Sequence, residues 1–80
     1  MNLATALTTF IQDEIVVDGT VVEVDTDLLL SGAVDSLGVI RITHWMEEVT
    51  GIEVDPGDVT LENFQTVAKM SAYLDSRTAA

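Results

Sequence analysis

The chain has 80 residues, enough for a single domain over residues 1–80, since what remains after one core is built could not form a second. Its 14 acidic and 3 basic residues give a net charge of −11, which disfavours nucleic acid and anionic lipid surfaces as partners. It has no cysteine for a disulfide, and its single histidine excludes a transition-metal site built on nitrogen and sulfur ligands.

The hydropathy pattern predicts a folded protein of the cytoplasm. Hydrophobic residues make up 48% of the chain, a fraction typical of globular proteins. Residues 1–40 contain no Lys or Arg, so a secretory signal with a basic start is not expected. No apolar run approaches the roughly 20 residues of a membrane helix. We therefore expect a soluble monomer that does not bind membranes.

The first element is an amphipathic helix from Leu3 to Ile15. Its apolar residues recur at steps of three and four, which is the spacing of one helix face. These residues are Leu3, Leu7, Phe10, Ile11 and Ile15.

Residues 16–34 lack a helical period and mix valines with turn-forming residues, which predicts a long loop. An unanchored loop of this length would be unusual in a compact domain. Val21, Val22, Val24 and Leu28–Leu30 are therefore expected to cover the core.

A second helix is predicted between Asp35, a residue type that caps helix starts, and Gly51, a residue type that ends helices. Spacing residues 100° apart divides this helix into two sides. The expected buried stripe is Val39, Ile42, Trp45, Met46 and Val49. The expected outward side is Leu37, Ile40, Arg41, His44, Glu47 and Glu48.

The last third of the chain predicts a short helix and a longer one. Pro56-Gly57 interrupts the chain, and a short turn or helix follows at Thr60–Phe64. A last helix is expected over Gln65–Asp75, before a frayed tail at residues 77–80. Its inward residues should be Val67, Met70, Ser71 and Leu74. The predicted fold is all-α, with three main helices, one short helix and a long loop between the first two helices.

The segment Leu30-Ser31-Gly32-Ala33-Val34-Asp35-Ser36-Leu37 closes the loop and opens the second helix with Asp-Ser-Leu. In an acidic chain of this size, with this order of helices, it resembles the acyl and peptidyl carrier protein family. Glu47-Glu48-Val49-Thr50-Gly51-Ile52 and Val54-Asp55-Pro56 resemble further stretches of that family. The resemblance covers nearly the whole chain and implies a four-helix bundle of carrier-protein type.

The resemblance also implies a cofactor and a site. A phosphopantetheinyl transferase would attach 4'-phosphopantetheine from coenzyme A to Ser36, between Asp35 and Leu37. A helix start favours such a phosphodiester anion, because its N–H groups and partial positive charge face the modified residue. The chain has no thiol of its own, so any thioester would be carried by the cofactor.

Two other chemistries are excluded by spacing. A serine hydrolase needs a base within hydrogen-bond reach, but His44 lies eight residues from Ser36, about 12 Å along a helix. Asp25-x-Asp27 begins like a calcium loop, yet leucines follow where a ligand and a glycine should stand. The prediction is therefore a carrier without catalytic residues and without a metal.

The outward side of the second helix is a candidate docking surface for transferase, acyltransferase, ligase or synthase enzymes with basic patches. Leu37 and Ile40 offer apolar anchors beside the charges of Glu47 and Glu48. Arg41 places a positive charge on a face that is acidic in the fatty-acid carriers of the family, and His44 stands where the family often has Met or another apolar residue. Arg41 would either select a dedicated partner through a carboxylate there, or pair within the chain with a nearby glutamate such as Glu48.

The segment from Asp58 to Val67 resembles the third-helix region of free-standing carriers in polyketide and nonribosomal peptide pathways. The expected function is therefore to carry acyl or aminoacyl thioesters on Ser36 for such a pathway. Two alternatives stay open. One is a helical docking module that is never modified, and the other is a carrier of primary fatty-acid synthesis.

Overall fold

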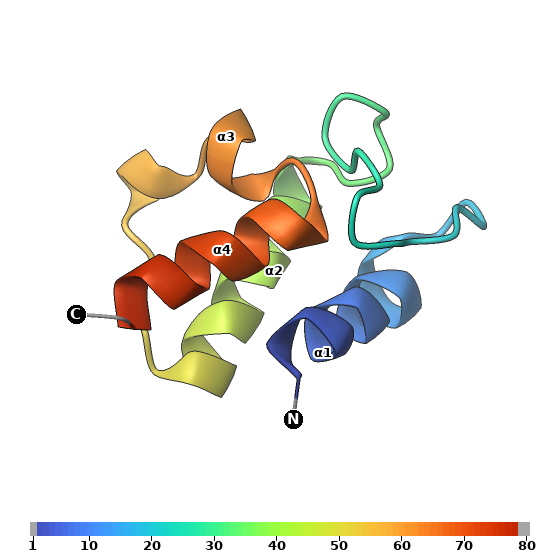
Figure 1. Cartoon of the computed structure of the whole chain (residues 1–80). Helices are drawn as coiled ribbons and strands as arrows, with labels where there is room; N and C mark the ends of the chain where they lie inside the picture. Colours follow the sequence, from blue (N-terminus) through green and yellow to red (C-terminus); the bar gives the residue numbers. More distant parts are fainter. Residues whose placement is uncertain (1, 79–80) are drawn as a thin grey trace.

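The computed structural model describes residues 2–78, and its elements are helices joined by one long loop (Figure 1). In chain order they are α1 (Leu3–Phe10), the π-helical turn η1 (Ile11–Ile15), α2 (Ser36–Thr50), the 3₁₀ turn η2 (Pro56–Asp58), α3 (Leu61–Phe64) and α4 (Val67–Thr78). Helix α4 packs against both α1 and α3, while η1 packs against α2. The predicted all-α fold with three main helices and one short helix is confirmed.

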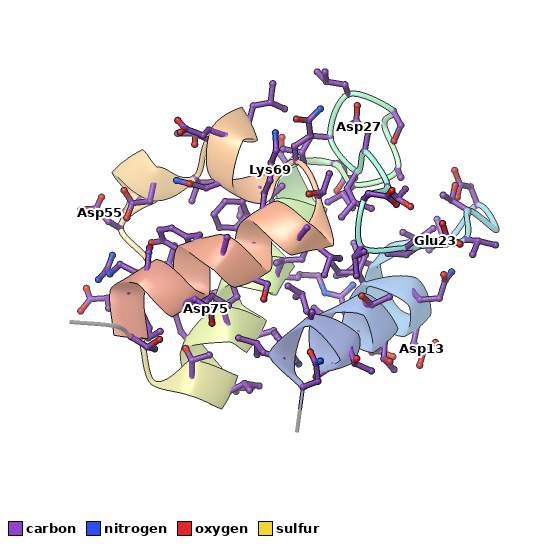
Figure 2. All side chains as sticks on the ribbon, in the orientation of Figure 1. Asp13, Glu23, Asp27, Asp55, Lys69 and Asp75 are labelled. Carbon is purple, nitrogen blue, oxygen red and sulfur yellow. The ribbon has the colours of Figure 1, made fainter. Side chains whose placement is uncertain are left out.

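A single apolar cluster forms the core, with contributions from every main helix and from the loop. Its largest fully buried side chains are Phe64, Leu7, Ile11, Leu28, Ile42, Met46, Met70, Leu74 and Val67. No charged side chain of residues 2–78 is buried. Acidic side chains from several elements point outward, as Asp13, Glu23, Asp27, Asp55 and Asp75 do in Figure 2.

The first helix spans the predicted residues but changes its geometry in the last turn. Asn2 caps its start, with Oδ1 accepting the Ala4 N–H at 2.9 Å. From Ile11 the chain widens to a π-helical turn, which closes with the Val16 N–H donating to the Ile11 carbonyl at 2.9 Å. Leu7 and Ile11 are fully buried, as the apolar spacing predicted.

The backbone of the loop over residues 16–34 is held by hydrogen bonds from other parts of the chain. The Gln12 side chain donates to the Thr20 carbonyl at 2.8 Å and accepts the Val22 N–H at 2.6 Å. Further along, the Leu28 N–H donates to the Gln65 carbonyl at 2.8 Å. These bonds hold an irregular segment against helices that lie far away in the sequence.

The expectation that every loop valine and leucine covers the core is wrong in part. Val22 and Leu28 are buried, but Val21, Val24 and Leu30 are exposed. Extended backbone sends successive side chains to opposite sides, so only one of two neighbouring valines can face inward. Hydrogen bonds to the loop backbone therefore anchor the loop together with the buried side chains of Val22 and Leu28.

Helix α2 begins and ends where the capping residues predicted. Asp35 Oδ1 accepts the Gly38 N–H at 2.8 Å, and Gly51 closes the helix in the left-handed conformation with φ of 73°. The buried stripe is shorter than expected, because Val49 is 44% exposed. The α1 residues that line the same surface hollow as Val49 include Thr5, Ala6 and Thr9, whose side chains are too short to cover it.

Gly38 allows α2 to approach the first helix closely. A Cβ at this position would lie 2.9 Å from Val34 Cγ1 and 3.0 Å from Ile15 Cγ2. Both distances are shorter than carbon atoms tolerate, so a side chain here would push α2 away from its neighbours. Gly38 therefore has a packing role.

The end of the chain is more helical than predicted. Helix α4 covers Val67–Thr78 instead of Gln65–Asp75, and Arg77 and Thr78 belong to it rather than to a frayed tail. Residues 79–80 lie outside the described residues. The helix starts late because Thr60 caps a separate short helix, α3, whose C-cap is Gln65. It ends late because Arg77 bonds to Asp58 and to the Glu53 carbonyl.

Tyr73 is a core residue that the predicted stripe omitted. Its ring is buried against Phe64, with ring centroids 5.9 Å apart, and its hydroxyl donates to Asp58 Oδ2 at 2.8 Å. Burial and this hydrogen bond to a carboxylate raise the pKa of Tyr73 above its ordinary value of 10.0. The folded chain thus favours the neutral phenol.

This raised pKa predicts a loss of stability at high pH. The contribution of neutral Tyr73 should be complete below pH 10 and should fall as pH rises through the raised pKa of the folded chain. We expect the thermal unfolding midpoint to decline above pH 10 in the wild type. The decline should be smaller in Tyr73→Phe, which has no phenol to ionise. Circular dichroism at increasing pH measures the midpoint of each protein. Equal declines in the two proteins would assign the loss of stability to groups other than Tyr73.

Candidate functional site

Ser36 is the first residue of α2 and is exposed to solvent. Asp35 precedes it in extended conformation and uses its carboxylate to bind the Gly38 N–H, while its carbonyl accepts the Val39 N–H at 3.0 Å. The N–H groups of Ser36 and Leu37 lie in the first helical turn, where they have no carbonyl of the preceding turn to bind. A hydroxyl at this place is accessible and faces the positive end of a helix.

The electrostatics of this end suit a singly charged phosphodiester. The helix dipole stabilises a negative group near its start by about 0.3–1 kcal/mol. Asp35 already places one carboxylate there, so an added phosphate would share the end with it. An anion on the Ser36 hydroxyl can therefore be accommodated, although most of the surrounding surface is acidic.

An apolar groove of about 400 Å³ lies beside Ser36. We call it the Ser36 groove; its lining residues are Leu29, Ser36, Val39, Ile40, Val59, Thr60, Leu61 and Phe64. One wall comes from α2, the opposite wall comes from the segment that leads into α3, and Leu29 of the loop contributes at the edge. No charged side chain lines the groove, so it offers an apolar surface next to the hydroxyl.

The outer wall of this groove was not predicted from the sequence. Val59 and Leu61 are 37% and 44% exposed, so they present apolar surface to solvent close to Ser36. Their signal in the sequence was a pair of apolar residues on either side of Thr60, one residue after Pro56-Gly57. The helical spacing of α2 could not reveal residues from another segment.

The predicted docking side of α2 is partly as expected. Leu37 and Ile40 are 65% and 55% exposed, and His44 and Glu48 also lie at the surface. Glu47 is less exposed than these residues, because its carboxylate is turned toward the backbone and accepts the Val54 N–H at 2.9 Å. Glu47 therefore holds the segment after α2 in place, in addition to adding surface charge.

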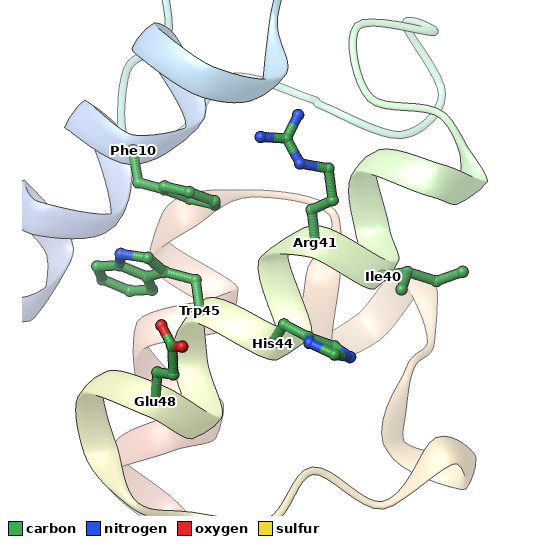
Figure 3. A pocket seen from close by; sticks show the side chains of 6 residues that line it. All are labelled: Phe10, Ile40, Arg41, His44, Trp45 and Glu48. Carbon is green, nitrogen blue, oxygen red and sulfur yellow. The ribbon is translucent and has the colours of Figure 1, made fainter.

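A second hollow, of about 350 Å³, lies where α2 faces α1 (Figure 3). It is lined by Phe10, Ile40, Arg41, His44, Trp45 and Glu48. The Phe10 and Trp45 rings stack with centroids 5.4 Å apart and planes inclined by 16°. This stack buries part of the Trp45 side chain. The predicted stripe had implied that Trp45 is fully buried in the core, and the structure shows that it is not.

Arg41 is engaged within the chain, but with Glu14 and not with Glu48. Its Nη1 donates to the Glu14 carbonyl at 2.7 Å, and its Nη2 lies 4.0 Å from the Glu14 carboxylate. Glu14 is in η1, so Arg41 satisfies a carbonyl at the end of the first helix. The side chain of Arg41 is still 47% exposed, which leaves part of the guanidinium accessible to a partner.

We expect Arg41→Gln to lower the free energy of unfolding by about 0.5–1.5 kcal/mol, the net value of one hydrogen bond. Arg41→Glu should cost more, because it sets a carboxylate beside a helix-end carbonyl and Glu14. Urea titrations of both variants measure the difference. Matched losses in the two would contradict this capping role.

Within residues 2–78 no group of three or more His, Cys, Asp and Glu side chains is arranged to hold a metal ion. In the same part of the chain, no helix is both long and apolar enough to cross a membrane.

Two comparisons with known proteins find similarity over most of the chain. The family model of the phosphopantetheine attachment site matches residues 5–74, a range that contains Ser36 and both walls of the groove. The chain is also 36% identical over 69 residues to the D-alanyl carrier protein of Abiotrophia defectiva. That match covers 86% of this chain and 82% of the other protein.

Proposed function

This chain belongs to the phosphopantetheine attachment family of carrier proteins, and we propose that it carries its 4'-phosphopantetheine on Ser36. The observation that carries the proposal is the position of Ser36: an exposed hydroxyl at the start of α2, with the apolar Ser36 groove beside it. Asp35 shapes this helix start through its bond to the Gly38 N–H, and Leu37 offers an exposed apolar side chain to the transferase.

In the proposed loading step, the Ser36 hydroxyl oxygen attacks the phosphorus that carries the pantetheine arm in coenzyme A. The pyrophosphate P–O bond breaks, 3',5'-adenosine bisphosphate leaves, and the hydroxyl proton passes to a base of the transferase. A partner enzyme then acylates the thiol of the arm, which the chain itself lacks. The carrier acts without catalytic residues of its own and presents the thioester to other enzymes.

Incubation with coenzyme A, Mg²⁺ and a broad-specificity phosphopantetheinyl transferase tests the proposal. The intact mass should rise by one phosphopantetheinyl group. An unmodified docking module would keep its original mass under conditions in which a known carrier is fully loaded.

We propose that the cargo is an acyl or aminoacyl group of a secondary pathway, such as polyketide or nonribosomal peptide synthesis, and not of primary fatty-acid synthesis. The positive charge of Arg41 beside His44 and Glu48 supports this, because generic fatty-acid enzymes present basic patches to their carriers. The family resemblance of residues 58–67 supports it as well.

D-alanine is a second candidate cargo, favoured by the 36% identity to a D-alanyl carrier protein. The two candidates are separated by offering the loaded chain to an adenylating enzyme that activates D-alanine and to a malonyl transferase. The enzyme that forms a thioester at the higher kcat/KM identifies the cargo class.

The proposed docking surface consists of Leu37, Ile40, Arg41, His44, Glu47 and Glu48, extended by Val59 and Leu61 across the groove. Exposed apolar residues from two walls would anchor a partner, while the net charge of −11 steers basic surfaces toward it. We place the chain in the cytoplasm as a monomer of one carrier domain, where transferases and biosynthetic enzymes can reach the arm.

Steering by charge predicts that partner association depends on salt. Screening limits electrostatic attraction to about 8 Å at physiological ionic strength. The association rate with a basic partner, such as the transferase, should therefore fall as salt is raised, while the dissociation rate changes less. Surface plasmon resonance at increasing salt measures both rates. An association rate independent of salt would contradict steering.

A further inference from the structure

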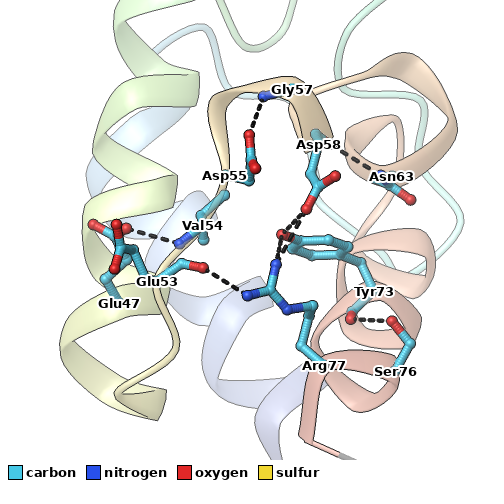
Figure 4. A network of polar contacts seen from close by, with 10 residues as sticks. All are labelled: Glu47, Glu53, Val54, Asp55, Gly57, Asp58, Asn63, Tyr73, Ser76 and Arg77. Atoms are coloured by element: carbon cyan, nitrogen blue, oxygen red, sulfur yellow. Dashed lines mark hydrogen bonds and ion pairs between the residues drawn. The ribbon is translucent and has the colours of Figure 1, made fainter.

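The segment that joins α2 to α3 is hydrogen-bonded to side chains of α2 and α4 (Figure 4). On the α2 side, the Glu47 carboxylate accepts the Val54 N–H at 2.9 Å. On the α4 side, Arg77 Nη2 donates to the Glu53 carbonyl at 3.2 Å. The chain therefore enters η2 from a fixed position.

Asp58, the last residue of η2, is the centre of the α4 contacts. Its Oδ2 atom accepts hydrogen bonds from the Tyr73 hydroxyl at 2.8 Å and from Arg77 Nη1 at 3.2 Å. Its carbonyl accepts the Asn63 side-chain amide at 2.9 Å, which links it to α3. The ion pair alone is too exposed to contribute much, but the buried ring of Tyr73 fixes the geometry of its hydroxyl.

The residues that directly follow Asp58 form the outer wall of the Ser36 groove. Val59, Thr60 and Leu61 line the groove opposite Val39 and Ile40 of α2. Helix α3 has only 4 residues, far below the length at which a helix is stable by itself. The position of this wall must therefore come from contacts at its two ends: the bonds of Asp58 at one end and the buried ring of Phe64 at the other.

We propose that the Tyr73–Asp58–Arg77 contact is a latch that sets the width of the Ser36 groove and so positions an apolar chain carried on the arm. With the latch closed, the outer wall stays close to α2 and excludes water from a chain in the groove. With the latch open, the wall moves on the short α3 and the chain is released to solvent. The three residues touch neither the arm nor the cargo, so they are positioning residues. This inference rests on the proposed function.

Thioester hydrolysis of two cargoes tests the latch. Octanoyl and acetyl forms of the chain are prepared with the transferase and the corresponding acyl coenzyme A, and their loss is followed by intact mass. In hydrolysis, water attacks the thioester carbonyl, the C–S bond breaks, and the carboxylic acid leaves the thiol behind. Only the longer chain can be sheltered by the groove.

Tyr73→Phe and Asp58→Ala should speed octanoyl hydrolysis about fivefold, which corresponds to about 1 kcal/mol for one lost hydrogen bond. Acetyl hydrolysis should stay unchanged in both. Asp58→Asn keeps an acceptor for the Tyr73 hydroxyl and should restore most of the shelter. Ser76→Ala is the matched control, since it also removes one hydrogen bond from α4, the one to the Tyr73 carbonyl, without touching Asp58.

Hydrogen exchange of the unloaded chain provides a second readout that does not depend on loading. Amides of residues 59–64 should exchange faster in Tyr73→Phe than in Ser76→Ala, while those of α1 stay unchanged. The latch would be overturned if Tyr73→Phe accelerated octanoyl and acetyl hydrolysis equally. It would also be overturned if Tyr73→Phe left the rate of octanoyl hydrolysis unchanged. If the wild type gains no arm, the proposed function fails, and local exchange at residues 59–64 alone decides whether the latch holds the wall.

Discussion

Replacing Ser36 with alanine should abolish the gain of phosphopantetheinyl mass while leaving the chain folded. The substitution removes the only side-chain hydroxyl in the first turn of α2, so no phosphodiester can form there. Its effect on stability should be about 1 kcal/mol or less, because Ser36 is exposed and Asp35 still caps the helix. Intact mass after incubation with the transferase, together with a circular dichroism melting curve, measures both outcomes.

Ser31→Ala is the matched control for this experiment. Ser31 is also exposed, lies five residues before Ser36, and sits in the loop rather than at a helix start. Its variant should load like the wild type. A Ser36→Ala protein that still gains the arm would show that Ser36 is not the attachment site. A Ser31→Ala protein that is folded but cannot be loaded would contradict attachment at Ser36 as well.

Phe64→Ala should produce the largest loss of stability among the substitutions considered. Its side chain is fully buried, contacts the Tyr73 ring, and also lines the Ser36 groove. Deleting a buried phenyl ring costs about 3–5 kcal/mol through lost burial and the cavity left behind. Small domains have only about 5–15 kcal/mol in total, so the variant should be partly unfolded at 37 °C.

Leu61→Ala provides the comparison, because Leu61 lies on the same short helix and lines the same groove but is 44% exposed. It should cost about 1 kcal/mol or less, since much of its side chain already contacts water. Urea unfolding of both variants gives the two free energies. Comparable losses would mean that α3 is held by its exposed side chain and not by the core contact of Phe64.

The sequence was informative wherever a local rule decides the structure. Asp35 and Gly51 set the ends of α2, because a cap depends on residues within one turn. The apolar spacing from Leu3 onward located the first helix and its buried residues. Leu37 and Ile40 were placed outward by the same geometry, and their exposed side chains agree with that placement.

Contacts between distant segments could not be predicted in this way. One of the two expectations for Arg41 was a pair with a nearby glutamate such as Glu48, but its donor reaches Glu14, 27 residues away in the sequence. Asp58 of η2 bonds to Tyr73 and Arg77 of α4. Val59 lines the same groove as residues of α2, although the two segments are separate in the sequence. Helical periodicity describes one element at a time, so it cannot report which elements face one another.

The central claim is that Ser36 bears the arm, and peptide mass spectrometry of the loaded wild-type chain tests it most directly. After loading, proteolysis and fragmentation should place the whole added mass on the residue at the start of α2, with every other serine unmodified. The ejected pantetheine fragment should come from that peptide alone. Modification of Ser31, Ser71 or Ser76, or complete absence of added mass beside a fully loaded control carrier, would contradict the account.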